Sequence, residues 1–384
     1  MNVYRLSFAV ILAASLVSCS PQPPVLPGVA EAMDKYIESG DAAGFVTLVA
    51  DRDGLVHLRA RGLADIAGAR PMREDTLFWI ASMTKPVTGV AVMMMVDEGR
   101  LALTDPVAKH IPEFAALRTP SGAPANLTIE QLLNHTSGMA DLPRGEGTQA
   151  RTLADFIPLY LALPMEFEPG SKWQYCQSSI NTAARIVEIV SGESFGAFLE
   201  KRLLQPLGMR DTTFFPTEAQ QARLATPYKK DPATGALVVD AFWVDPRTHD
   251  RPPLANGGLF STARDYAQFA RMLLRRGELD GRRYLSEAAV AALVTDRTKD
   301  IPAGFVPGSA WGVATILVRE PQGVTAGLSP GSFGHGGAFG TQAWVDPVRG
   351  VAHLLFYQRS DIGNGDGSPM RGAFHDAVAH ALQR

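Results

Sequence analysis

Segments with the residue pattern of β-strands stand at both ends of this chain, and helical patterns fill the stretch between them. The strand-like segments are 44–50, 55–60, 311–318, 341–345 and 351–358. The first two flank Asp51-Arg52-Asp53-Gly54, and a glycine-containing turn between β-rich runs is typical of a hairpin. This order predicts one sheet domain formed by both termini, with a helical domain inserted. We place the sheet subdomain at about 29–81 plus 300–384 and the helical subdomain at about 82–299.

Eight segments have helical periodicity. They are 29–39, 82–98, 128–134, 152–163, 180–190, 195–204, 263–275 and 371–382. The second of these contains Pro86, and proline is tolerated only in the first turn of a helix. That helix is therefore expected to begin at or just before Ser82, which leaves the serine in its first turn.

The N-terminus reads as a targeting segment, not as part of the fold. Residues 6–17 are apolar but too few to span a bilayer as a helix. The run ends in Leu16-Val17-Ser18-Cys19, which resembles a bacterial lipobox. We predict a lipoprotein signal peptide at 1–18, lipidation of Cys19 and a proline-rich tether at 19–28. An ordinary secretory signal with an incidental cysteine is the alternative. The predicted protein is exported and lipid-anchored at a bacterial membrane, facing the periplasm.

Charge and cysteine content narrow the possible partners. The formal net charge is −3 and no basic cluster is present, which argues against a nucleic-acid partner. The chain has two cysteines, Cys19 and Cys176. If Cys19 is acylated, Cys176 has no partner for an intramolecular disulfide. A chain of this size can bury enough core to fold without one.

Ser82 and Lys85 are the first candidates for chemistry. They are three residues apart on a predicted helix, so their side chains share one face and can touch. A hydroxyl becomes a good nucleophile when a neighbouring base takes its proton. Lysine can be that base only if burial or nearby charge lowers its pKa well below about 10.4. A capping serine beside a solvated lysine is the simpler interpretation of this pair taken alone.

Two further stretches draw attention, and each has a plain structural interpretation. Tyr175 precedes the helix at 180–190, where a tyrosine is usually a half-buried packing residue; its neighbour Cys176 reads as a small buried side chain. Residues 331–340 contain five glycines, which would let a ligand approach the backbone closely. The alternative there is a flexible loop.

One serine motif is a poor candidate. Gly327-Leu328-Ser329-Pro330-Gly331 matches the nucleophile elbow G-x-S-x-G, and Asp346 and His353 follow in hydrolase order. The elbow needs an N–H on the residue after the serine, and Pro330 has none. No H-E-x-x-H, C-x-x-C or P-loop motif is present, so neither a metal nor another cofactor is predicted.

Taken in order, these residues resemble the penicillin-recognising serine hydrolases. The similar branch contains class C β-lactamases, D-alanyl-D-alanine carboxypeptidases and family VIII carboxylesterases. Ser82-Met83-Thr84-Lys85 resembles its first motif, Tyr175-Cys176-Gln177 its Tyr-x-Asn, and His335-Gly336-Gly337 its Lys-Thr-Gly or His-x-Gly. Connecting stretches that also resemble the family are 132–138, 169–175, 206–212 and 256–262. The resemblance implies an α+β, β-lactamase/transpeptidase-like fold with an antiparallel sheet flanked by helices.

The resemblance also implies roles for individual residues. Ser82 is the nucleophile that becomes acylated, and Lys85 and Tyr175 share the acid and base work. The backbone N–H groups of Ser82 and Ala338 form the oxyanion hole. The substrate-binding residues are Gln177, His335, Gly336 and Gly337. His335 lines the site and receives a substrate carboxylate or carbonyl. The reaction is a two-step acyl transfer on a small-molecule ester, amide or peptide, without a metal or cofactor.

Two departures from the family pattern bear on the substrate. Gln177 stands in place of asparagine, so its longer side chain changes the reach toward Lys85. His335 stands in place of lysine, and a mostly neutral imidazole holds a carboxylate less strongly than a permanent cation. We therefore predict a carboxylesterase-like serine hydrolase. The alternatives are a D-alanyl-D-alanine carboxypeptidase, a weak β-lactamase and a non-catalytic sensor that keeps the fold.

Overall fold

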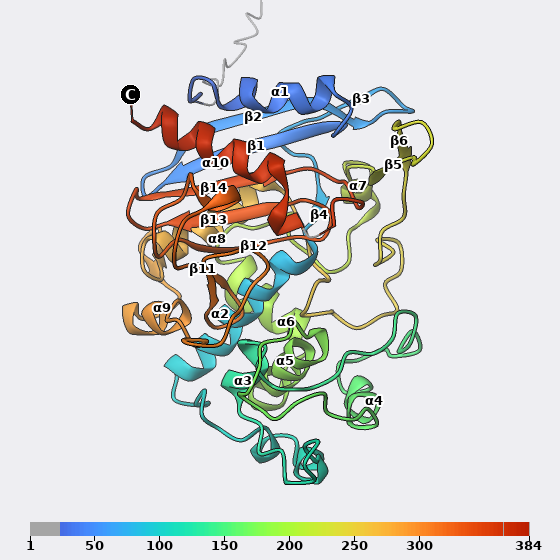
Figure 1. Ribbon diagram of the computed structural model, residues 1–384, viewed down its shortest axis with the longest axis vertical. Helices are drawn as coiled ribbons and strands as arrows, with labels where there is room; N and C mark the ends of the chain where they lie inside the picture. The colour runs from blue at the N-terminus through green and yellow to red at the C-terminus, as the bar shows by residue number, and fades with distance from the viewer. Residues whose placement is uncertain (1–23, 364, 384) are drawn as a thin grey trace, which may run out of the picture.

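Strands from both ends of the chain form one eight-stranded antiparallel sheet, in the order β10-β11-β12-β13-β14-β1-β2-β3 (Figure 1). The computed structural model describes residues 24–363 and 365–383. The strands of this sheet are β1 (Gly44–Asp51), β2 (Leu55–Asp65), β3 (Arg70–Pro71), β10 (Ser309–Trp311), β11 (Ile316–Val318), β12 (Phe333–Gly336), β13 (Gln342–Asp346) and β14 (Val351–Phe356). The short pairs elsewhere are β4 (Phe78–Trp79) with β7 (Phe260–Ser261), β5 (Tyr228–Lys230) with β6 (Leu237–Val239), and β8 (Glu278–Leu279) with β9 (Arg282–Arg283).

Helices cover the sheet and fill the segment between its two halves. They are α1 (Val29–Glu38), α2 (Thr84–Asp97), α3 (Ile129–Leu133), α4 (Phe156–Leu161), α5 (Gln177–Ser191), α6 (Phe195–Leu199), α7 (Glu218–Gln221), α8 (Ala263–Leu274), α9 (Glu287–Leu293) and α10 (Pro369–Ala381). The short turns are η1 (Ala81–Met83), η2 (Val107–Lys109), η3 (Pro112–Ala116), η4 (Glu200–Leu204), η5 (Gly323–Thr325) and η6 (Gly365–Gly367). The predicted antiparallel sheet flanked by helices is confirmed.

Both faces of the sheet are buried. Helices α1 and α10 pack against each other on one face, and α8 packs on the other against β1, β13 and β14 (Figure 1). In β1, Phe45 and Val49 point into the core under α1 and α10, while Val46 and Leu48 join the larger core on the opposite side. This explains why β1 reads as a continuous apolar run, since a strand covered on both faces has no solvent side.

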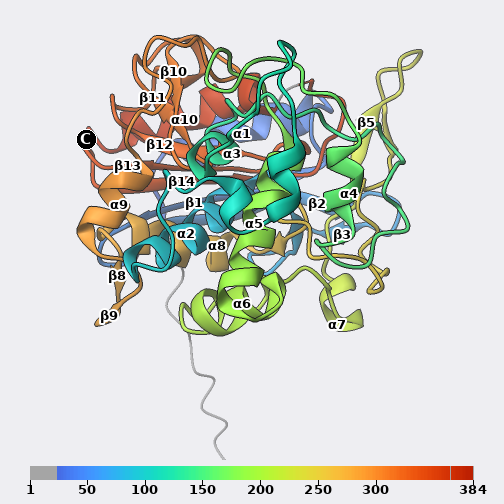
Figure 2. The ribbon, with the colours of Figure 1, turned by 90° about the horizontal axis from the view of Figure 1, so that it is seen from below.

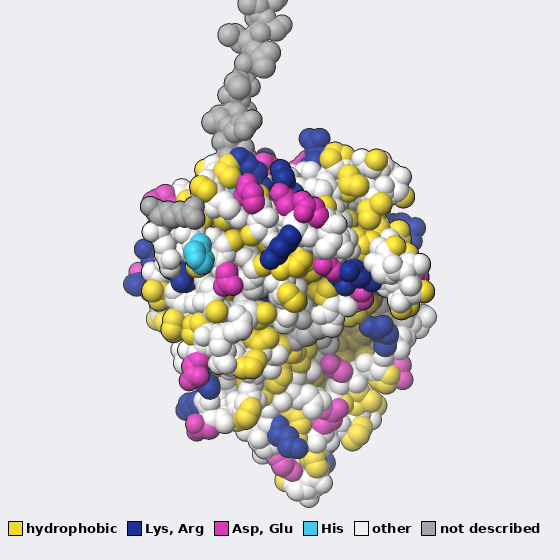
Figure 3. Space-filling model, turned by 45° about the horizontal axis from the view of Figure 1, so that its top comes forward, with side chains coloured by type: hydrophobic (Ala, Val, Ile, Leu, Met, Phe, Trp, Pro, Cys, Tyr) yellow, Lys and Arg dark blue, Asp and Glu magenta, His cyan; other side chains and the backbone are white. Residues whose placement is uncertain are grey.

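In the inserted segment, α5 packs against both α2 and α3 (Figure 2). Helix α8 also comes from the range predicted as the helical subdomain, yet it lies against the sheet. The pairing of β4 with β7 joins residues just before η1 to residues just before α8. On the face seen in Figure 3, basic and acidic side chains lie close to one another.

The segment predicted as one strand at 311–318 is a hairpin. Strands β10 and β11 pair antiparallel, with Trp311 opposite Ile316. The turn between them places Ala314 at a φ of 52°, in the left-handed region. Alanine is not a residue that signals a turn in a sequence. The apolar pattern of 311–318 therefore continues across the turn and predicts a single strand.

The N-terminal predictions fall largely on residues that are not described. Cys19 and residues 1–18 lie outside the described range, so the signal peptide and the lipid anchor stay predictions. Residues 24–28, predicted as the end of a tether, lie along β2 instead of extending from the domain. Leu58 N–H donates to the Pro24 carbonyl and Leu26 N–H donates to His57 Nδ1, both at 3.1 Å. Within the described part of the chain, no helix is both long enough and apolar enough to cross a membrane.

Buried histidines are expected to make the fold sensitive to acid. His57 lies 2.9 Å from Thr47 Oγ1, and burial lowers its pKa to about 4; burial lowers the pKa of His353 to about 4 as well. Below the unfolded pKa of about 6.5, the unfolded chain binds protons that these folded imidazoles do not. The free energy of unfolding should therefore fall between pH 6.5 and 4, by up to about 3 kcal/mol per imidazole. Asp265, whose pKa burial raises to about 6, opposes part of this loss.

Urea denaturation at pH 7.5 and pH 5 measures this loss of stability. A His57→Gln variant keeps polar atoms at the site but does not titrate, so its stability should fall less over the same interval. An equal loss of unfolding free energy between pH 7.5 and pH 5 in the variant and the parent would contradict the role of His57.

Candidate active site

Ser82 lies where β4 ends and α2 begins. Residues 81–83 form the turn η1, which continues directly into α2, so the helix begins two residues later than predicted and the serine lies in the turn that leads into it. Ala81 has a φ of 44°, a left-handed conformation that costs energy for a residue with a Cβ. Two hydrogen bonds hold this bend: Ile80 N–H donates to the Leu259 carbonyl at 3.1 Å, and Thr84 Oγ1 donates to the Ala81 carbonyl at 2.7 Å.

Lys85 is fully buried beneath the serine. Its Nζ lies 2.8 Å from Gln177 Oε1, 2.5 Å from the Asn256 carbonyl and 3.3 Å from Ser82 Oγ. A neutral amine has two N–H donors and one lone pair. The ammonium form donates to all three oxygens; in the neutral form, with its two donors directed to Gln177 and Asn256, the lone pair is left for the Ser82 hydroxyl. Burial lowers the pKa of Lys85 to about 7, although Asp141 and Asp366 act in the opposite direction.

Tyr175 stands over the lysine from the segment that leads into α5. The Lys85 Nζ lies 4.5 Å from the centre of the Tyr175 ring. The ring packs against His135 and Phe305, with centroid separations of 4.6 and 4.9 Å. Burial raises the pKa of the Tyr175 phenol well above its ordinary value, and a hydrogen bond with Ser82 only partly offsets this. Tyr175 is therefore a neutral phenol at neutral pH, in contact with the serine.

Gln177 contacts Lys85 although its side chain is longer than that of the asparagine in the family motif. It is the first residue of α5, and Asp141 holds that end of the helix. Asp141 Oδ1 accepts from the backbone N–H groups of Gln177 and Ser178, both at 2.7 Å. These bonds satisfy free N–H groups at the start of the helix, and so they fix the Gln177 side chain over Lys85.

His335 reaches the site from β12, and its hydrogen bonds assign its tautomer. Its Nδ1 lies 2.7 Å from the Gly336 carbonyl, which can only accept, so Nδ1 carries the proton. Burial lowers the pKa of His335 to about 3, so the ring is neutral. Its Nε2 is therefore an acceptor, and it lies 3.4 Å from the Tyr175 hydroxyl.

Gly337 touches the strand that leads to the nucleophile. A Cβ on this residue would lie 2.6 Å from the Ile80 carbonyl, and closer still to Thr341 Oγ1. Gly337→Ala should therefore push the end of β12 away from Ser82. We expect kcat/KM to fall about a hundredfold, because displacements of about 1 Å can cost that much, and stability to fall by about 1–3 kcal/mol. Esterase assays and thermal denaturation measure the two effects.

Gly54→Ala is the matched control for that substitution. No atom lies within 4 Å of a Cβ built on Gly54, which sits in the hairpin turn far from the site in sequence. Its activity should stay within about twofold of the parent. A Gly337→Ala protein with parental activity would show that the contact between β12 and Ile80 does not hold the site together.

A pocket of about 410 Å³ brings the predicted residues together. Its lining is Ser82, Tyr175, Gln177, Trp243, Phe305, His335, Gly336, Gly337, Ala338, Gly363, Gly365 and Asp366. Every predicted catalytic and substrate-binding residue lines it except Lys85, which lies just beneath Ser82. Trp243, Phe305 and Asp366 were not predicted. They come from loops or a short turn, and none belongs to a motif, so no local pattern in the sequence could have identified them.

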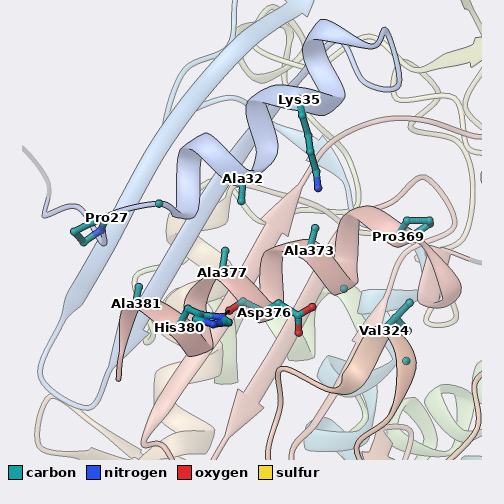
Figure 4. Close-up of a pocket in the computed structure, with 13 residues that line it drawn as sticks. Pro27, Ala32, Lys35, Val324, Pro369, Ala373, Asp376, Ala377, His380 and Ala381 are labelled. Carbon is teal, nitrogen blue, oxygen red and sulfur yellow. Dashed lines mark hydrogen bonds between the residues drawn. The ribbon is translucent and has the colours of Figure 1, made fainter. Parts of the chain in front are cut away.

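Another pocket, of about 540 Å³, lies between α1 and α10 on the outer side of the sheet (Figure 4). Lys35, Asp376 and His380 line it among small and apolar residues. None of its lining residues is a serine, threonine or cysteine. It therefore offers no hydroxyl or thiol nucleophile among its lining residues, whereas the pocket at Ser82 does.

The other serine motif does not form a catalytic triad. Ser329 Oγ accepts from Arg349 Nη1 at 3.0 Å, and Asp346 accepts from the same guanidinium at 2.8 Å. His353 Nδ1 instead lies 3.2 Å from His375 Nδ1, inside the core. The described residues also contain no group of three or more His, Cys, Asp or Glu placed to hold a metal ion.

Comparison with known proteins agrees with this geometry. The sequence model of the β-lactamase family matches residues 29–371. Esterase EstB of Burkholderia gladioli is 29% identical over 90% of this chain and 93% of its own length. Penicillin-binding protein 4 of Amycolatopsis lactamdurans is 30% identical over 79% of this chain and 77% of its own. The structure of EstCE1, a hydrolase with promiscuous acyltransferase activity, superposes with a TM-score of 0.76 at 23% identity, covering 91% of this chain and 97% of the other.

The chain belongs to the β-lactamase family, whose relatives here include both esterases and penicillin-binding proteins.

Proposed function

We propose that the protein hydrolyses small carboxylic esters through an acyl-enzyme on Ser82. The observation that carries this proposal is the hydrogen-bond set of Lys85. Gln177 and Asn256 accept from two N–H groups of the amine, and its third position, the lone pair of the neutral form, is directed toward Ser82 Oγ at 3.3 Å. Its pKa of about 7 leaves a large fraction of the amine neutral near neutral pH. A buried amine in this state is a general base directed at a hydroxyl.

Acylation begins when Ser82 Oγ attacks the ester carbonyl carbon and its proton passes to Lys85 Nζ. The carbonyl oxygen becomes an oxyanion, for which the backbone N–H groups of Ser82 and Ala338 are the proposed donors. Each such donor is worth about 3 kcal/mol of transition-state stabilisation. The C–O bond then breaks, and the alcohol leaves with a proton supplied through the Tyr175 hydroxyl, which Lys85 replenishes.

Deacylation reverses these proton transfers with water in place of the alcohol. Water gives up a proton toward Tyr175 and Lys85 as its oxygen attacks the acyl carbon. Ser82 Oγ then leaves and recovers its proton. The resting base in this scheme is Lys85, because the Tyr175 pKa lies well above its ordinary value and the Lys85 pKa lies below.

Ester hydrolysis is favoured over β-lactam or peptide hydrolysis by the state of His335. The resemblance suggested that His335 receives a substrate carboxylate, but its Nδ1–H is already donated to Gly336 and its Nε2 is an acceptor. We propose instead that His335 accepts from the Tyr175 hydroxyl and orients it. A β-lactam or a D-alanyl-D-alanine peptide carries a carboxylate that this neutral ring cannot bind.

The decisive experiment compares p-nitrophenyl butyrate with nitrocefin on the purified protein. It also treats the protein with a fluorophosphonate and identifies the labelled peptide by mass spectrometry. Ester turnover that exceeds nitrocefin turnover, with labelling on Ser82, supports the proposal. Strong nitrocefin turnover would favour a β-lactamase. An absence of both turnover and labelling would favour a non-catalytic sensor.

A further inference from the structure

The pocket at Ser82 contains one charged residue among its described lining, and that residue is an acid. Asp366 lines the pocket beside Gly336, while the other lining side chains are aromatic, small, hydroxyl, amide or imidazole groups. A Cβ on Gly336 would lie within contact distance of Asp366 Oδ1, so the carboxylate sits directly against β12, next to His335. A substrate bound at Ser82 therefore lies close to a buried carboxyl group on this side of the pocket.

Asp366 is held in place by the interior of the protein. It is 3% exposed, and its Oδ1 lies 3.6 Å from Nη1 of Arg371, which is fully buried. Arg371 Nη1 also donates to the Asp366 carbonyl at 2.6 Å, and the guanidinium lies 3.8 Å from the centre of the Trp344 ring. Burial lowers the pKa of Arg371 only to about 10, so it stays cationic and favours an anionic partner. Burial raises the pKa of Asp366, and the Arg371 charge together with hydrogen bonds from the Gly336 backbone and the Gln342 side chain acts in the opposite direction, toward the carboxylate.

The cations near the pocket are engaged elsewhere. Lys85 gives its donors to Gln177 and Asn256, and Arg371 lies behind Asp366 without lining the pocket. The Arg144 guanidinium lies 4.6 Å from the centre of the Trp243 ring, and Arg144 does not line the pocket. Near the scissile bond, a substrate carboxylate would lose its water and meet an acid in place of a base.

We propose that Asp366 is a specificity-determining residue that excludes carboxylate-bearing substrates and restricts the site to uncharged esters. The inference rests on the proposed esterase function and names its substrate class. It follows from which of the two paired charges reaches the pocket: Asp366 lines it, and Arg371, paired with Asp366, does not. The acid pairs with the buried Arg371 cation, so that guanidinium is not available to bind a substrate carboxylate.

The test uses matched ester pairs that differ by one carboxylate. On the acyl side, p-nitrophenyl butyrate is compared with mono-p-nitrophenyl succinate, which has the same chain length and leaving group. On the alcohol side, methyl 4-butyryloxybenzoate is compared with 4-butyryloxybenzoate. Each kcat/KM is divided by the rate constant for hydroxide-catalysed hydrolysis of that ester. The protein should prefer the neutral ester by more than about fivefold in at least one pair.

Two variants assign the preference to Asp366. Asp366→Asn leaves the Arg371 charge without its partner, so the ratio of anionic to neutral turnover should rise more than about tenfold. The double variant Asp366→Asn/Arg371→Met removes both charges, which buried pairs tolerate better than the loss of one partner. Its ratio should lie between those of the parent and the single variant, and it serves as the test if Asp366→Asn does not fold.

The outcomes separate this inference from the proposed function. Absence of turnover of every ester by the parent protein would count against the proposed function itself. Ester turnover with less than fivefold preference in both pairs would overturn the role of Asp366 and leave the esterase proposal intact. A double variant with the same ratio of anionic to neutral ester turnover as the parent would likewise overturn the role of Asp366.

Discussion

Replacing Ser82 with alanine should lower kcat for p-nitrophenyl butyrate by at least about ten-thousandfold, the loss typical of removing the nucleophile of an acyl-transfer enzyme. The reason is that the Ser82 hydroxyl lies against Lys85 Nζ and contacts the Tyr175 phenol, and the described lining of the pocket contains no second serine, threonine or cysteine to take over its role. The substitution removes one half-buried oxygen and should leave the melting temperature within a few degrees of the parent.

Ser329→Ala is the matched control for this prediction. Ser329 lies in the chain's other serine motif, but its hydroxyl accepts from Arg349 away from the pocket. Its loss should leave ester turnover within about twofold of the parent. Retention of more than a tenth of the parental activity by Ser82→Ala, or a large loss in Ser329→Ala, would show that the nucleophile has been assigned wrongly.

Replacing Lys85 with arginine should lower kcat/KM about a hundred- to ten-thousandfold, the range that general-base catalysis contributes. Arginine keeps the positive charge and the donors toward Gln177 and Asn256, but it does not lose its proton near neutral pH. The variant therefore isolates the basic function of the amine from its charge.

The pH dependence of the parent protein checks the same residue from the other direction. Burial places the Lys85 pKa at about 7, so the amine is protonated and inactive as a base below that pH. Ester turnover should rise with pH through an acid limb centred near 7, and residual turnover by Lys85→Arg should lack that limb. An acid limb that persists in the arginine variant would assign the titration to another group.

Local features of the sequence were sufficient to predict that Ser82 and Lys85 lie in contact. Ser82 and Lys85 are three residues apart, and any helix over that stretch puts them on one face. Pro86 located the start of the helix, because proline is tolerated only there. The hairpin at 44–60 was predicted for a similar reason, since its turn and its two β-rich runs are contiguous in the chain.

The hairpin of β10 and β11 could not be predicted from local residues. Its turn depends on Ala314 in a left-handed conformation, which the surrounding structure imposes: Ala314 N–H donates to the Leu133 carbonyl at 2.9 Å. That hydrogen bond joins residues far apart in the chain. No pattern within residues 311–318 records it, so the alternating apolar residues predicted one strand.

The chemical state of the site was also beyond the sequence. The motifs identified Lys85, Tyr175 and His335 as candidates but left open which group is the resting base. The answer depends on burial, which lowers the pKa of the lysine and raises that of the phenol, and on the Gly336 carbonyl, which sets the histidine tautomer. Burial and hydrogen-bond direction are properties of the folded environment of a group.

The sequence by itself determined the family, the arrangement of strands at both ends of the chain with helices between them, and the residues proposed to carry the reaction, because each of these depends on contiguous motifs or short-range periodicity. Only the tertiary structure decided which groups surround those residues. Asp366, Trp243 and Phe305 reach the pocket from segments more than 50 residues apart, and packing of the sheet against the helical segment brings them to Ser82. Substrate selection depends on such long-range neighbours, which is why the chemistry could be predicted before the specificity.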